Sequence, residues 1–118
     1  VNWKKGPNKW AKGKLSKHYN KHVLEQGEFG DISMKQYHEL MEDFLMDNSP
    51  SYKYAKIGNH IIKFDPATER VLIGNAKNRE ILTFYKSKPE FVKKDPFTDA
   101  VDEALSKTGM SPSDVQYK

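Results

Sequence analysis

The spacing of hydrophobic and polar residues changes near residue 51 of this chain. Before that point, apolar residues recur every three or four positions, which predicts amphipathic helices over residues 14–26 and 33–47. The expected ends are Gly27 or Gly30 for the first helix, and Asp31 or Ser33 as the cap that starts the second. The apolar stripes consist of Leu15, Tyr19 and Val23 in the first helix, and of Tyr37, Leu40, Met41, Phe44 and Leu45 in the second.

After residue 51 the period becomes two, which is the period of β-strands. Gly58-Asn59 and the polar stretches 65–69 and 75–79 indicate turns. A last helix is expected from Phe97 to about Lys107, with Phe97, Val101, Ala104 and Leu105 facing inward. The predicted fold is therefore α+β, with N-terminal helices packed on one face of a twisted antiparallel β-meander of about four strands.

With 118 residues, the chain is expected to form a single domain spanning residues 1–118. Because it begins with Val1, we expect it to be a piece of a longer protein. Trp3 and Trp10 interrupt the lysines of its first segment; they are either anchors onto the core, which we favour, or stacking surfaces for bases. The predicted segments are a basic arm (1–13), a helical part (14–50), an antiparallel sheet (51–88) and a C-terminal helix and tail (89–118).

Composition excludes several classes of protein. Cysteine is absent, which excludes disulfide bonds and thiolate zinc sites. No apolar run approaches the ~18 residues of a membrane-spanning helix. Aromatic residues make up 12% of the chain, which argues against disorder.

Charge is distributed in blocks that the net value of +4 conceals. The formal charge is +7 for residues 1–24, −6 for 25–50, +6 for 51–94 and −3 for 95–118. This alternation predicts one positive and one negative face, and a positive face commonly binds nucleic acid. The alternative is an ordinary solvated surface rich in lysine.

His18 and His22 lie one helical turn apart, with Lys21 between them, in residues 1–24, which contain no Asp or Glu. Histidine exchanges protons near neutrality, so the pair is suited to general acid–base catalysis beside a phosphate. The alternatives are histidines that half-pack against the sheet, or a zinc site. Zinc is disfavoured because the glutamate of an HExxH motif is missing and Lys21 would repel a cation. We therefore predict no metal and no cofactor, and expect His38 to be a surface or packing residue.

The last predicted strand adds Thr83 and Tyr85, which the period of two places on the same face, opposite Phe84. The Thr83 hydroxyl can donate to a phosphate oxygen, and Tyr85 can stack on a base or donate its phenol. The alternative is the ordinary preference of these residue types for strands.

Cleavage of RNA without a metal needs only a few such groups. A base deprotonates the 2′-hydroxyl, an acid protonates the departing 5′-oxygen, and cations stabilise the phosphoryl charge. The predicted catalytic residues are His18, Lys21, His22, Thr83 and Tyr85, and the predicted substrate-binding residues are Lys14, Lys17, Lys53 and Lys86.

The residues 14–88 resemble the toxin ribonucleases of the barnase/EndoU/colicin/RelE superfamily. The resemblance is carried by Leu15-x-x-His18-Tyr-Asn-Lys21-His22, by Glu28-Phe29-Gly30, and by a meander that ends in Thr83-x-Tyr85-Lys86. The nearest branch is that of the C-terminal toxin domains of contact-dependent growth inhibition proteins, which also occurs in phage proteins.

This resemblance implies an α+β fold, metal-independent cleavage of RNA, often tRNA, and a cognate immunity protein. His18, Lys21 and His22 match the family's helical motif, and Thr83 and Tyr85 match its Ser/Thr-x-aromatic. Colicin D-like members have a Lys-x-x-His spacing that this chain lacks, because Leu15 and Tyr19 precede the two histidines by three. Which histidine is essential, and whether Lys21, Lys14 or Lys17 supplies the cation, therefore stays open.

The resulting hypothesis is a secreted or cell-surface effector whose C-terminal nuclease domain acts in the cytoplasm of a target bacterium. Its expected partners are tRNA, an acidic immunity protein and an activating host factor. Two other hypotheses are a non-catalytic nucleic-acid-binding module and a phage accessory protein that keeps the fold without the activity.

Overall fold

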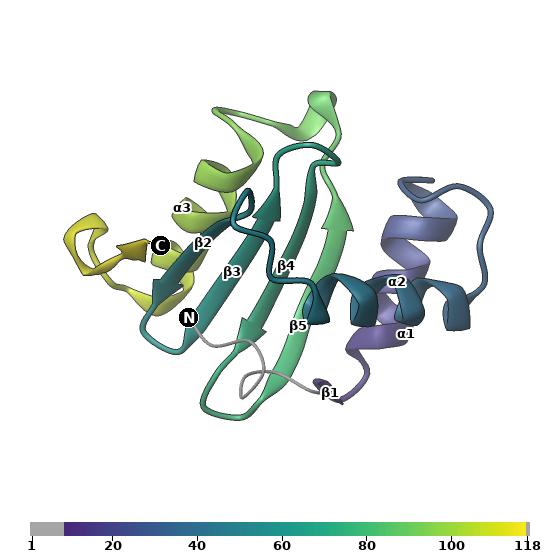
Figure 1. The fold of residues 1–118 in the computed structure, drawn as a ribbon, viewed down its shortest axis with the longest axis horizontal. Helices are drawn as coiled ribbons and strands as arrows, with labels where there is room; N and C mark the ends of the chain where they lie inside the picture. The colour runs from purple at the N-terminus through teal and green to yellow at the C-terminus, as the bar shows by residue number, and fades with distance from the viewer. Residues whose placement is uncertain (1–8, 118) are drawn as a thin grey trace.

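The fold is a six-stranded sheet with helices on both faces (Figure 1). It is taken from a computed structural model that describes residues 9–117. Trp3 and the rest of residues 1–8 of the predicted basic arm lie outside the described residues. In chain order, the elements are β1 (Lys9–Trp10), α1 (Lys14–Tyr19), η1 (Asn20–Glu25), α2 (Met34–Met46), β2 (Lys53–Ile57), β3 (His60–Asp65), β4 (Arg70–Asn75), β5 (Glu80–Lys86), η2 (Pro89–Phe91), α3 (Pro96–Thr108), η3 (Pro112–Asp114) and β6 (Gln116–Tyr117).

The predicted meander is confirmed: β2, β3, β4 and β5 pair antiparallel in sequence order. Two short strands extend it at its edges, giving the order β1-β5-β4-β3-β2-β6. β1 pairs in parallel with the start of β5, and β6 pairs antiparallel with β2. The sequence pattern gave no sign of β1 and β6, because strands of two residues carry no measurable period.

The two long helices cover opposite faces of the sheet. α2 buries Tyr37, Met41, Phe44 and Leu45 against one face, forming with Ile61, Leu72, Ile81 and Phe84 what we call the first core. α3 buries Phe97, Ala100, Val101 and Ala104 against the other face, forming with Ile62, Phe64, Val71 and Ile73 the second core. Only the N-terminal helices were predicted to lie on a face of the sheet, and the position of α3 on the other face was not predicted. The consecutive apolar residues Ile61-Ile62 and Val71-Leu72-Ile73 indicate that both faces of the sheet are covered, because a strand buried on both faces shows no alternation.

Local sequence explains where the helices begin and end. Ser33 caps α2 in a reciprocal capping box with Gln36, which resolves the choice between Asp31 and Ser33. Asp95 accepts from the backbone N–H of Thr98 and caps α3, and Gly109, with φ of 70°, ends it. No helix in the described part of the chain combines the length and the apolar character needed to cross a membrane.

Lys63 connects the sheet to the C-terminus of α2. Its side chain is fully buried, and its ammonium donates to the carbonyls of Phe44 at 2.8 Å, Leu45 at 3.2 Å and Asp47 at 2.7 Å. The last turn of α2 has no basic residue of its own, so this strand lysine satisfies carbonyls that the helix leaves open. Burial lowers the pKa of Lys63 to about 8.

We expect Lys63→Met to lower the free energy of unfolding by about 3 kcal/mol at pH 7, because buried carbonyls lose their donor. Between pH 8 and 10.5, the unfolded wild type binds a proton at Lys63 that the folded state does not, so the free energy of unfolding of the wild type rises with pH. The difference in free energy of unfolding between the wild type and Lys63→Met should therefore increase over this range. Urea unfolding of both proteins at several pH values measures this. Lys77→Met, in an exposed turn, is the matched control; equal stability of the two variants would contradict the assigned role.

Candidate functional site

The helical segment 14–25 presents His18 and His22 on one side, with their rings stacked 5.5 Å apart at an interplanar angle of 10°. The segment begins after Gly13, whose φ is 76°, and widens in its second half into a π-helix, η1. Gln26 donates its backbone N–H to the carbonyl of Lys21, five residues earlier. π-turns inside helices are rare and frequently lie at functional sites.

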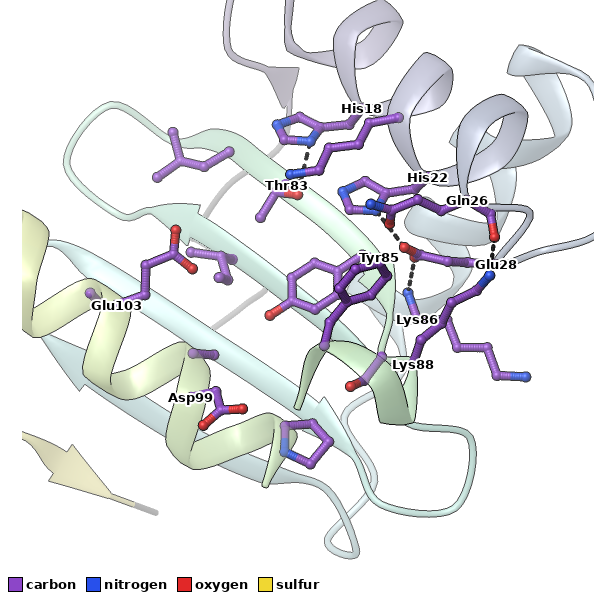
Figure 2. Close-up of a pocket in the computed structure, with 18 of the residues that line it drawn as sticks. His18, His22, Gln26, Glu28, Thr83, Tyr85, Lys86, Lys88, Asp99 and Glu103 are labelled. Carbon is purple, nitrogen blue, oxygen red and sulfur yellow. Dashed lines mark hydrogen bonds and ion pairs between the residues drawn. The ribbon is translucent and has the colours of Figure 1, made fainter. Parts of the chain in front are cut away.

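The chain turns back after η1 and places Glu28 beside His22. After the left-handed Gly27, the backbone N–H of Glu28 donates to the carbonyl of His22 at 2.9 Å. The Glu28 carboxylate is 3% exposed, and its Oε2 lies 2.8 Å from His22 Nδ1. Its Oε1 accepts the backbone N–H of Lys86 in β5 at 2.8 Å (Figure 2). One buried carboxylate thus orients an imidazole and holds the helical segment against the sheet.

β5 supplies Thr83 and Tyr85 on the side that faces the histidines. The register of β5 against β4 slips between Ile73 and Gly74, so Leu82 is an extra, bulged residue. Because of this bulge, Ile81 and Phe84, three positions apart, both belong to the first core. Thr83 and Tyr85 point the other way, as predicted.

Side-chain contacts join β5 to the helical segment. Thr83 Oγ1 lies 3.1 Å from His18 Nδ1, a hydrogen bond in which either group can donate, depending on the imidazole tautomer. The Tyr85 ring stacks on His22 at 5.4 Å with an interplanar angle of 20°. The structure therefore brings together the four groups that were predicted to share a site.

Trp10 extends the stack beyond the two histidines. Its ring lies 6.3 Å from that of His18, giving the order Trp10, His18, His22, Tyr85. The indole N–H donates to His38 Nδ1 at 3.0 Å, and His38 Nε2 lies 3.0 Å from Glu42. Trp10 also packs on the first core, so for Trp10 the anchoring role is confirmed, and His38 is a packing residue that holds it.

His18, His22, Thr83 and Tyr85 line a cavity of about 740 Å³, here called the histidine cleft, between α1, β5 and α3. Its two sides differ in charge. Most of the lining lysines lie on the side of α1 and β5, whereas α3 contributes two carboxylates. Figure 2 shows Tyr85 between these carboxylates and Lys86. The charged lining groups are Lys14, Lys17, Lys21, Glu28, Lys86 and Lys88 on the first side, and Asp99, Glu103 and Lys107 on the second.

Burial and neighbouring charge set the protonation states in the cleft. Burial, and then the positive charges of His22 and nearby lysines, lower the pKa of His18 to about 4. His18 is therefore neutral at pH 7. Burial and the carboxylates Glu103, Glu28 and Asp99 raise the pKa of Tyr85 well above its usual 10, so its phenol keeps its proton and can donate.

Lys53 is the one predicted site residue that the structure does not bring to the cleft. It lies on β2, and its Nζ is 5.9 Å from the centroid of the Phe97 ring. β3 and β4 separate β2 from β5, a distance of roughly 14 Å at the usual strand spacing. Its assignment to substrate binding is corrected on that ground. The other eight predicted residues line the cleft: Lys14, Lys17, His18, Lys21, His22, Thr83, Tyr85 and Lys86.

Sequence reasoning missed the role of Glu28. In the sequence, Glu28 stands out only as part of the segment Glu28-Phe29-Gly30. The useful signal was Gly27, which ends the helix and turns the next side chain back toward its last turn.

No protein-family model matches this chain, and a search of curated proteins finds no match. The described residues contain no group of three or more His, Cys, Asp or Glu side chains arranged to hold a metal ion. The fold and the site thus define an α+β protein with a two-histidine cleft, one imidazole of which is paired with a buried carboxylate.

Because the lysine charges contribute to the low pKa of His18, we expect Lys17→Gln to raise that pKa from its wild-type value of about 4. The measurement is an NMR titration of the imidazole resonances. Lys12→Gln, in the turn before α1, removes the same charge from a residue that is not among those acting on His18 and should leave its pKa unchanged. A wild-type His18 that titrates near 6.5 would contradict the electrostatic account.

Proposed function

We propose that this protein is a metal-independent endoribonuclease that cleaves RNA through its own 2′-hydroxyl. The observation that carries the proposal is the meeting of two imidazoles, a threonine hydroxyl and a tyrosine phenol in one lysine-lined cleft. Lysines hold the phosphodiester, and the imidazoles exchange the protons. RNA carries its own nucleophile, so positioning and proton transfer suffice.

In the proposed reaction, a base removes the proton of the 2′-hydroxyl, whose oxygen forms a bond to the adjacent phosphorus. The bond from phosphorus to the 5′-oxygen breaks, and an acid protonates that oxygen. The products are a 2′,3′-cyclic phosphate and a 5′-hydroxyl. Lys21 and the protonated phenol of Tyr85 stabilise the charge that develops on the phosphoryl oxygens.

The electrostatics favour different roles for the two histidines. His18 is neutral at pH 7, as a base must be. If its Nδ1–H donates to Thr83, its Nε2 is free to accept the proton of the 2′-hydroxyl. His22 donates its Nδ1–H to Glu28, and this carboxylate stabilises the imidazolium that acts as the acid. This assignment makes Thr83 a positioning residue for His18.

The proposed biological setting follows from the resemblance of residues 14–88 to toxin ribonucleases. The domain would be the C-terminal part of a secreted or cell-surface effector and would act on tRNA in the cytoplasm of a target bacterium, with an activating host factor as a further partner. An acidic immunity protein would neutralise it. The lysine-rich side of the cleft would attract both an anionic substrate and an acidic inhibitor.

The first test is incubation of tRNA with the protein in the presence and absence of EDTA. We expect cleavage in both conditions, and we expect His18→Ala and His22→Ala each to reduce the rate by about 10²–10⁴-fold. The activity, kcat/KM, should fall as the pH drops through about 4, because His18 then becomes protonated. If both variants cut as fast as wild type, the assigned site is wrong. Salt-sensitive RNA binding without cleavage would favour a binding module instead.

Glu28→Gln tests the role of the negative charge on the buried carboxylate. The amide oxygen can still accept the Lys86 backbone N–H, but the charge that stabilises the His22 imidazolium is lost. We expect kcat to fall by about 10²-fold or more while the thermal unfolding midpoint changes little. Glu25→Gln, an exposed residue at the end of η1, is the matched control and should retain wild-type kcat. An active Glu28→Gln variant would show that His22 needs no charged partner.

A further inference from the structure

The acidic side of the histidine cleft has no part in the proton transfers described above. On this side the carboxylates of Asp99 and Glu103 outnumber one lysine, Lys107, whereas the other side carries five lysines, so a phosphodiester binds more favourably on the lysine side. The cleft volume of about 740 Å³ is large enough for a further part of the substrate to lie against α3. In RNA, the uncharged part beside each phosphate is the nucleoside.

The carboxylates of Asp99 and Glu103 differ in the hydrogen bonds and ion pairs that they form within the protein. Asp99 is occupied: its Oδ2 accepts the backbone N–H of Lys93 at 2.8 Å, and its Oδ1 accepts that of Lys94 at 3.1 Å. It therefore fastens the segment before α3. Glu103 Oε1 forms an exposed ion pair with Lys107 at 3.1 Å. Among the described residues, nothing forms a hydrogen bond or ion pair with Glu103 Oε2.

Phe91 places an exposed aromatic ring at the same cleft. It is the last residue of η2, lines the cleft, and is 63% exposed. The backbone N–H of Phe91 donates to Lys88, and Asp99 holds the following residues, so the ring is carried on a fastened segment. An exposed ring beside a basic groove is typical of sites where a base stacks.

We infer that Phe91 and Glu103 form a nucleobase subsite that favours guanine, an inference that rests on the proposed function. The base stacks on Phe91, and its donor edge faces the Glu103 carboxylate. Figure 2 shows Glu103 on α3 across the cleft from the histidines, with Tyr85 between them. The sugar-phosphate then extends toward the lysines.

The choice of guanine follows from the donors on each base. Guanine presents N1–H and N2–H side by side, which matches the two oxygens of one carboxylate. Each carboxylate oxygen has two lone pairs, so Oε1 of Glu103 can keep Lys107 while accepting a second donor. Adenine and cytosine place one amino group next to a ring nitrogen that repels the second oxygen, and uracil has one N–H between two carbonyls.

The test is calorimetric titration of the protein with the 3′- and 5′-monophosphates of the four ribonucleosides. Guanosine should bind most tightly, and Glu103→Gln should weaken it by roughly 10-fold or more and shift the preference toward adenine, whose acceptor and donor an amide matches. Phe91→Leu should weaken all four nucleotides by similar factors, because stacking does not distinguish the bases. Glu90→Gln, an exposed residue of η2 that does not line the cleft, should bind like wild type.

The outcomes separate this subsite from the proposed reaction. If RNA is cleaved but Glu103→Gln leaves the base preference unchanged, both in titrations and in the sequenced RNA ends, the subsite is wrong and the nuclease stands. If guanosine binds through Glu103 but no RNA is cleaved, the subsite stands and the nuclease is wrong. Equal binding of all four nucleotides by the wild type overturns the guanine preference, and binding of none overturns the subsite.

Discussion

The site depends on the position of one buried carboxylate. Glu28 bonds to His22 with one oxygen and to the backbone N–H of Lys86 with the other, so it fixes both the imidazole and its distance from the sheet. Burial of this carboxylate is costly unless its oxygens have partners, and the two bonds supply them. Together with the hydrogen bond from the Lys88 ammonium to the Gln26 carbonyl, this link joins the end of η1 to the end of β5 at the point where the cleft forms.

The bond from Glu28 to Lys86 also satisfies part of the outer edge of β5. β5 pairs with β1 only at Glu80 and Ile81, so most of its outer edge lacks a partner strand. Tyr37, from α2, donates its hydroxyl to the carbonyl of Phe84, and Glu28 accepts the N–H of Lys86. Side chains of the helical part therefore satisfy the edge that a further strand would otherwise cover. This arrangement leaves Thr83 and Tyr85 facing a cleft beside the helix.

Features set by local sequence were predictable, and features set by tertiary contacts were not. The apolar stripe predicted α2, the turn residues predicted four strands in their observed order, and the period of two placed Thr83 and Tyr85 together. The helical spacing placed His18 beside His22. The meeting of these two pairs across 65 residues of sequence required the three-dimensional fold.

The failures have equally specific causes. Lys53 was assigned from charge alone, which does not give the order of strands in a sheet. The position of α3 on the second face was not predicted, because its signal lay only in the unbroken apolar runs of β3 and β4. Glu28 was missed because its two partners, one on a π-turn and one at a strand edge, are defined only in the folded chain.

The most direct test of the central claim is the chemistry of the cleaved ends. A synthetic RNA that the protein cuts is compared by mass spectrometry with the same RNA carrying a single 2′-deoxynucleotide on the 5′ side of the cut. Attack by the 2′-hydroxyl predicts a 2′,3′-cyclic phosphate on one fragment and a 5′-hydroxyl on the other, with the deoxy-substituted RNA left intact. Fragments that end in a 3′-hydroxyl and a 5′-phosphate, or cleavage of the deoxy-substituted RNA, would contradict it.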